Sequence, residues 1–150
     1  MDDITEWLKL AAEVEYLFGS MVSDPNFVKG LEKTIGRSSA YCVRLNDGPP
    51  GSPLLGGLLW SSNPPTYKIG CLSVSFKARK QGVATELLNY VFRLVKTPAE
   101  VVVTTFGDNV IEGLPARMLY KKFGFVPLDE PLPNGPEGVS RKKFKRILTS

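Results

Sequence analysis

The sequence predicts an α+β domain of the mixed α/β kind, in which two helices precede a sheet. Apolar residues recur at helical spacing over residues 4–18, and short apolar runs separated by Pro/Gly turns fill residues 40–74. An almost purely β-branched run, Val101–Phe106, follows a further helical segment. With 150 residues, 43% of them hydrophobic, the chain fits a single globular domain over residues 1–150.

Two helices are expected first. The helix over residues 4–18 carries its apolar residues on one face and ends at Gly19. The second helix begins at Asp24-Pro25, because aspartate is a good N-cap and proline suits the first helical position. It ends at Gly36.

Strands and helices then alternate. The expected strands are Ala40–Leu45, Leu54–Trp60, Tyr67–Val74, Val101–Phe106, Phe125–Leu128 and Lys143–Leu148. The first three are separated by turns at Asn46–Pro53 and Ser61–Pro65. Helices are expected from about Gly82 to Val95 and over Pro115–Phe123. Because Val101–Phe106 is so apolar, we expect it to be buried on both faces.

Composition excludes several kinds of chemistry. The chain has no histidine, which removes the usual general base and the usual zinc ligand, so Ser-His-Asp and HExxH sites are excluded. Cys42 and Cys71 do not make a disulfide framework, and we expect a reducing, cytoplasmic setting. The N-terminus resembles neither a signal peptide nor a membrane anchor. The formal charge of +4 suits a phosphate-bearing ligand, although weak nucleic-acid contact would also fit.

The turn Arg79–Thr85 has the features of an anion site. Gly82 and Ala84 are small enough for the backbone to approach a ligand. The first N–H groups of the following helix lack internal partners, and Arg79 and Lys80 add cations beside them. The turn lacks the Gly-Lys-Ser/Thr ending of a P-loop, and a tight strand-to-helix connection is the structural alternative.

Two segments in order resemble the GNAT superfamily of N-acetyltransferases. Leu72-x-Val74 followed by Arg79-x-x-Gly82-x-Ala84 resembles the family's acyl-CoA motif, and Ala116–Phe125 resembles its A-x-x-L-Y-x-x-x-G-F signature. The resemblance implies a GNAT-like acyl-CoA N-acyltransferase fold with a central, mostly antiparallel sheet flanked by helices. It also implies acetyl-CoA as co-substrate, transfer to an amine and no metal.

The resemblance further implies roles for individual positions. Backbone N–H groups of the turn would hold the pyrophosphate, and the Leu72–Val74 backbone would pair with the pantetheine arm. The N–H of Val74 or a neighbour would face the thioester oxygen. The cofactor-binding set is Leu72, Ser73, Val74, Arg79, Lys80, Gln81, Gly82, Val83, Ala84, Thr85, Asn109, Ala116 and Tyr120.

The catalytic residues are less constrained by the pattern. The resemblance makes Tyr120 the general acid, although a tyrosine near a helix end can also serve packing alone. The general base is open among Glu13, Glu15, Asp24, Asp108 and Glu112. Glu15 is favoured slightly, because the family lines its acceptor site with the first two helices. Pocket lining and packing both fit Trp60 and Tyr67, and also Tyr16, Phe18 and Met21.

Two departures from the family stand out. The chain starts on a helix where the family usually has a first strand, so that strand is lost, replaced or supplied by another chain, which leaves a homodimer open. Gly113 occupies a position where many members have an asparagine that contacts the cofactor, and Asn109 is the substitute we consider.

The sequence therefore predicts an N-acetyltransferase that moves an acetyl group from acetyl-CoA directly to a primary amine. The acceptor, a small molecule or a peptide, is not specified, and no membrane partner is expected. One alternative is a non-catalytic acyl-CoA-binding or sensing module. The other is a small nucleic-acid-binding domain that uses the basic cluster Arg141, Lys142, Lys143, Lys145 and Arg146. For that cluster, a solvated strand whose cations protect its edge is the structural alternative.

Overall fold

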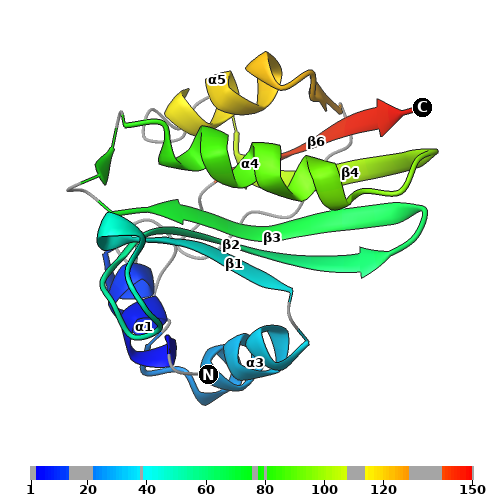
Figure 1. Ribbon diagram of the computed structural model, residues 1–150. Helices are drawn as coiled ribbons and strands as arrows, with labels where there is room; N and C mark the ends of the chain where they lie inside the picture. The colour runs from blue at the N-terminus through cyan, green and yellow to red at the C-terminus, as the bar shows by residue number, and fades with distance from the viewer. Residues whose placement is uncertain are drawn as a thin grey trace. The chain divides into compact units, whose positions relative to one another are not determined.

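The computed structural model describes residues 3–13, 22–37, 39–75, 78–79, 81–107, 114–128 and 140–149 (Figure 1). The chain forms two compact units. The first unit comprises Met1–Ser61 and Cys71–Leu94, and the second comprises Ser62–Gly70 and Val95–Ser150.

The predicted mixed α/β class is confirmed. The elements are α1 (Ile4–Ala12), α3 (Pro25–Gly36), β1 (Ala40–Arg44), the 3-10 helix η1 (Leu45–Asp47), β2 (Leu54–Asn63), β3 (Thr66–Val74), α4 (Val83–Leu94), β4 (Ala99–Phe106), α5 (Leu114–Lys122), β5 (Val126–Pro127) and β6 (Arg141–Leu148). The strand order is β1-β2-β3-β4-β6-β5. Strands β3 and β4 pair in parallel, whereas β1 with β2, β4 with β6 and β5 with β6 pair antiparallel.

In the first unit, two neighbouring glycines of β2 receive helices on opposite faces of the strand. A Cβ added to Gly57 would collide with the indole ring of Trp7 on α1. A Cβ added to Gly56 would lie 2.5 Å from Val83 Cγ1 at the start of α4. Because successive residues of a strand point to opposite faces, α1 and α4 cover opposite sides of β2, as Figure 1 shows.

The core on the α1 side of β2 joins α1 and α3 to the sheet. Its buried members are Trp7, Leu10, Leu31 and Leu54. Helix α3 begins as predicted, since the side chain of Asp24 accepts a hydrogen bond from the N–H of Asn26 at 2.9 Å. The predicted end of this helix at Gly36 is also confirmed.

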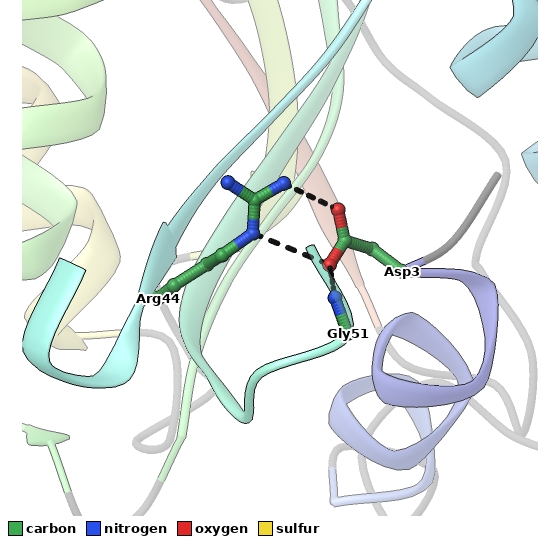
Figure 2. A network of polar contacts seen from close by, with 3 residues as sticks. All are labelled: Asp3, Arg44 and Gly51. Carbon is green, nitrogen blue, oxygen red and sulfur yellow. Dashed lines mark hydrogen bonds and ion pairs between the residues drawn. The ribbon is translucent and has the colours of Figure 1, made fainter. Parts of the chain in front are cut away.

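A polar network ties the start of α1 to β1 and to the turn before β2 (Figure 2). Arg44 donates to both carboxylate oxygens of Asp3, from Nε at 3.3 Å and from Nη2 at 2.6 Å, and the N–H of Gly51 donates at 2.9 Å. The Asp3 side chain is only 14% exposed. These hydrogen bonds, those from Arg44 above all, hold the pKa of Asp3 below its usual range.

In the second unit, β4 and β6 pair along their whole length, from Ala99↔Leu148 to Phe106↔Arg141. Helix α5 packs on this pair through Tyr120, whose ring lies 6.2 Å from that of Phe144. Arg117 on α5 is buried and donates from Nη1 to the carbonyl of Gly107 at 2.7 Å. This hydrogen bond ties α5 to the residue that follows β4.

Several predicted boundaries differ from the structure. Strand β2 runs to Asn63, so the predicted Ser61–Pro65 turn shortens, because backbone pairing extends beyond the last apolar side chain. Leu45 begins a 3-10 turn instead of ending a strand. Val101–Val103 are buried as predicted, but Thr104 is exposed, so the expectation of burial on both faces is wrong there.

Two further expectations concern the N-terminal half. Helix α1 occupies Ile4–Ala12, and residues 14–18 of the predicted helix lie outside the described residues. Ahead of β1, the described residues form the helices α1 and α3.

Candidate functional site

The end of β3 carries the first part of the predicted donor site. The parallel pairs between β3 and β4 end at Ile69↔Val103, while β3 continues to Val74. Ser73 is 6% exposed and Ser75 is 7% exposed. The N–H of Ser75 donates to the carbonyl of Leu55 at 2.8 Å, which anchors the exit from β3 to β2.

The turn that follows leads directly into α4. The N–H of Ala78 donates to the carbonyl of Ser75 at 2.9 Å, and the Ala78 side chain is buried. Gly82 has a φ of +78°, a conformation that glycine adopts at little cost. No heavy atom lies within 4 Å of a Cβ built on Gly82, so the space beside its backbone is open.

The first turn of α4 provides the donors for an anion. The first helical hydrogen bond runs from the N–H of Glu86 to the carbonyl of Gly82 at 2.9 Å. The N–H groups of Val83, Ala84 and Thr85 therefore lack intrahelical acceptors, and the positive end of the helix dipole coincides with them. The residues present thus fit a pyrophosphate group.

The described residues around this turn carry charges of both signs. Arg79 is exposed and donates from Nε to the carbonyl of Val74 at 3.5 Å, a long hydrogen bond that links the turn to the end of β3. Glu86 is the acidic residue of the first turn of α4. Lys80, which was also predicted to contact the cofactor, lies outside the described residues.

Gly56 is a supporting residue that sequence reasoning did not assign to the site. A Cβ at this position would lie 2.5 Å from Val83 Cγ1 and 3.1 Å from the carbonyl oxygen of Ser73. Glycine therefore lets the start of α4 pack closely on β2, beside the predicted donor strand. A glycine inside a predicted strand often marks such a close approach, and this was the available signal.

Cys71 also lies on the donor strand. Its Sγ is 3.4 Å from Ser73 Oγ, and burial raises the pKa of the thiol. A thiol with a raised pKa stays protonated near neutral pH, whereas a nucleophilic cysteine must be a thiolate. Cys71 therefore lacks the activation that a covalent acyl-enzyme route would need.

The remaining predicted residues divide into two groups. Ala116 and Tyr120 lie on α5 in the second unit, where Tyr120 is 4% exposed and its ring packs 5.5 Å from that of Phe125. Its aromatic ring therefore serves packing. Glu15 and Asn109 lie outside the described residues.

Two of the five candidates for the general base are described. Asp24 is engaged as the N-cap of α3, which accounts for its presence. Glu13 follows α1 and accepts a hydrogen bond from Ser75 Oγ at 3.2 Å. Asp108 and Glu112 lie outside the described residues, as does Gly113.

For Trp60 and Tyr67, the sequence left both pocket lining and packing open, and in the structure both side chains are packed in the interior. Trp60 is buried and lies edge-on to Tyr41 at 5.9 Å. Tyr67 is buried, and its hydroxyl accepts a hydrogen bond from the N–H of Lys96. Tyr16, Phe18 and Met21 lie outside the described residues.

The basic cluster lies on β6, which stands between β4 and β5 in the strand order. The interpretation of its cations as protectors of an edge strand is therefore wrong where β6 pairs on both sides. Lys145 forms an ion pair with Glu100 on β4 at 2.9 Å, and that contact lowers the pKa of Glu100. Phe144, in the middle of the cluster, is fully buried.

Comparison with known proteins identifies the family of this chain. Residues 1–125 match the acetyltransferase (GNAT) family. The chain belongs to the GNAT acetyltransferase family. No curated protein matches it. Membership supports acetyl transfer and binding of coenzyme A as the general activity, and it confirms the resemblance drawn from the two motifs.

Solved structures of GNAT proteins share the fold over nearly the whole chain. A ribosomal-protein-alanine N-acetyltransferase from Brucella melitensis is 13% identical, with a TM-score of 0.75, and the match covers 99% of this chain and 96% of that one. Ard1 from Thermoplasma volcanium is 17% identical, with a TM-score of 0.75 and coverage of 99% and 93%. The structure of the NatC complex bound to Gag peptide and CoA includes a chain that is 18% identical, with a TM-score of 0.74 and coverage of 99% and 92%.

Among the helices of the described part of the chain, none is both long enough and apolar enough to span a lipid bilayer.

Proposed function

We propose that this GNAT protein transfers an acetyl group from acetyl-CoA directly to a primary amine of an acceptor molecule. The observation that carries the proposal is the turn into α4. Gly82 has a positive φ and open space beside it, and the first N–H groups of α4 follow at once. This arrangement continues from a strand that runs past its pairs with β4.

Different residues of the site are assigned to different parts of acetyl-CoA. We assign the pyrophosphate to the backbone N–H groups of Gln81–Ala84. Arg79 and Lys80 add positive charge beside it, and Thr85 adds a hydroxyl. The backbone of Leu72–Val74 pairs with the pantetheine arm as an added strand, in which Ser73 is one of the paired residues. The N–H of Val74 stabilises the oxyanion that forms at the thioester carbonyl. Asn109 and Ala116 complete the cofactor contacts in this proposal.

The transfer is direct. The raised pKa of Cys71 argues against an acyl-cysteine intermediate on the donor strand. Tyr120 acts as the general acid that returns a proton to the leaving thiolate. Because a thiol has a pKa near 8.5, its departure needs only modest assistance.

The acceptor is a small molecule or a peptide with a free amino group. Similar folds include an enzyme named for ribosomal-protein alanine and a complex crystallised with Gag peptide, which makes peptide amino termini worth testing first. Small amines and lysine side chains complete the panel, since acceptor sites are built from loops that vary within one fold.

Two measurements test this function. Calorimetry with acetyl-CoA is expected to show binding at micromolar concentrations, and no heat at high micromolar cofactor would contradict the proposal. Thiol release across the panel of amines then identifies the acceptor. Arg79→Gln is expected to weaken acetyl-CoA binding, whereas Lys29→Gln, on α3, serves as a control of equal charge change.

We also propose that residues 1–150 act as one domain in the cytoplasm. The family match extends through residue 125 and so includes segments from both compact units. Cys42 and Cys71 are free thiols, which suits a reducing compartment. A single thermal transition by circular dichroism and near-ultraviolet absorbance would support one cooperative domain, and two separate transitions would contradict it. Cell fractionation tests the compartment.

A further inference from the structure

Helix α1 is fixed to the sheet of the first unit at three points along its length. At its start, Asp3 is bound by Arg44 and by the N–H of Gly51 (Figure 2). In its middle, the indole of Trp7 fills the space above Gly57. At its end, Glu13 Oε1 accepts a hydrogen bond from Ser75 Oγ at 3.2 Å. The helix therefore holds the backbone of Glu13 in a defined position.

The partner of Glu13 lies at the donor strand. Ser75 follows Val74, the residue to which we assign the oxyanion N–H, and Ser75 is 7% exposed. Its own N–H is bonded to the carbonyl of Leu55 at 2.8 Å, which fixes its backbone. The carboxylate of Glu13 therefore contacts the residue that directly follows Val74, whose N–H we assign to the thioester carbonyl.

A carboxylate at this place suits the proton transfer that the reaction requires. An ionised carboxylate has two oxygens and accepts hydrogen bonds without donating any, as a proton acceptor must. Glu13 is partly buried, which allows access to solvent. Of the acidic candidates that the structure describes, Asp24 caps α3 and Glu13 contacts the donor strand.

We propose that Glu13 is the general base of the acetyl transfer, and that Ser75 positions its carboxylate. The inference rests on the proposed function. In the step, the amine nitrogen forms a bond to the acetyl carbon and the carbon–sulfur bond breaks. The nitrogen gives up one proton to the Glu13 carboxylate, which passes it to water. The leaving sulfur gains one proton, so atoms and charge balance.

The decisive variant is Glu13→Gln. The amide oxygen of glutamine can still accept the hydrogen bond from Ser75, so the contact is retained while the basic group is lost. With the acceptor found by thiol release, we expect kcat/KM to fall about 100-fold or more. Acetyl-CoA affinity by calorimetry stays within about twofold, so the loss is confined to the acetyl transfer.

Three further variants separate catalysis from structure. Glu6→Gln removes a carboxylate from the same helix, one paired with Lys9 at 2.9 Å, and we expect it to retain full activity. Glu13→Asp keeps a carboxylate and is expected to recover part of the rate. Ser75→Ala is expected to lower kcat by about tenfold or less with little change in KM, as for a positioning residue.

Several outcomes would overturn the assignment. Wild-type turnover with an unchanged rate in Glu13→Gln would show that the contact with Ser75 is structural only. A loss confined to Glu15→Gln would place the base two residues further along. If Glu13→Gln failed to fold, an inactive but folded Glu13→Asp would also contradict the proposal. Binding of acetyl-CoA without acetylation of any amine would refute the proposed function itself, and with it this inference.

Discussion

At the scale of single residues, Asp3 shows how a small polar network couples stability to pH. Arg44 holds the pKa of Asp3 below its usual value, so the folded state binds this proton less readily than the unfolded chain does. The stabilisation is present above the unfolded pKa, near 3.9. It is lost as the pH falls through the lower folded value.

Asp3→Asn is therefore expected to destabilise the protein at neutral pH. The amide cannot form the ion pair, and we expect a loss of about 1–2 kcal/mol in the free energy of unfolding. Urea unfolding at pH 7 and at pH 3 measures the effect, and the difference from wild type should shrink at the lower pH. An equal difference at both pH values would show that charge is not the cause.

For Tyr120, the question is whether it serves as general acid or in packing alone, since its ring is buried against Phe125 and Phe144. Tyr120→Phe keeps that packing and removes only the hydroxyl. If Tyr120 is the general acid, kcat should fall about tenfold, a modest effect for acid catalysis because a thiolate leaves readily. Acetyl-CoA affinity should not change. An unchanged kcat would reduce Tyr120 to a packing residue, and a sensing module would show no turnover at all.

At the scale of elements, the start of α4 depends on a glycine in another strand. We expect Gly56→Ala to push Val83 away from β2 and so displace the first turn of α4. Acetyl-CoA affinity should fall about fivefold, which corresponds to about 1 kcal/mol. Gly30→Ala on α3 is the control, because no heavy atom lies within 4 Å of its added Cβ. Calorimetry on both variants would reveal whether the effect is specific to Gly56.

Elements of this chain were predictable where a local signal existed. Asp24-Pro25 marked the start of α3 and the apolar periodicity of Val83, Leu87 and Val91 marked α4, because caps and periodicity act within a few residues. The Gly82 turn was found for the same reason. The contact of Glu13 with Ser75 spans 62 residues, and no local pattern encodes it.

Supporting contacts were missed for related reasons. A sequence shows that Gly56 lies in a strand, but it does not show which helix packs above it. Nothing in the sequence distinguishes Arg117 from the two lysines on the same short helix, whereas in the structure its guanidinium is buried and donates to the carbonyl of Gly107. The extra length of β2 was missed because exposed residues such as Ser61 continue backbone pairing without an apolar signal.

At the scale of the whole molecule, the net positive charge raises the alternative that the protein binds nucleic acid. The chain carries a formal charge of +4, and its basic cluster lies on β6. The strand is also structural, since it pairs with β4 from Arg141 to Leu148 and buries Phe144. Truncation before Arg141 would remove this pairing, so loss of any activity in such a variant would say nothing about nucleic acid.

Charge substitutions on β6 give a cleaner test of the nucleic-acid alternative. Arg141 and Lys143 alternate with the buried Phe144 side of the strand, so Arg141→Gln with Lys143→Gln lowers the charge without opening the core. We expect wild type to bind RNA or DNA only weakly, and the double variant to acetylate its acceptor at an unchanged rate. Binding that weakens steeply with salt, with a slope reduced by about two in the double variant, would instead identify β6 as a nucleic-acid surface. The acetyltransferase proposal predicts the first result, because its donor site uses the backbone of α4 and does not draw on β6.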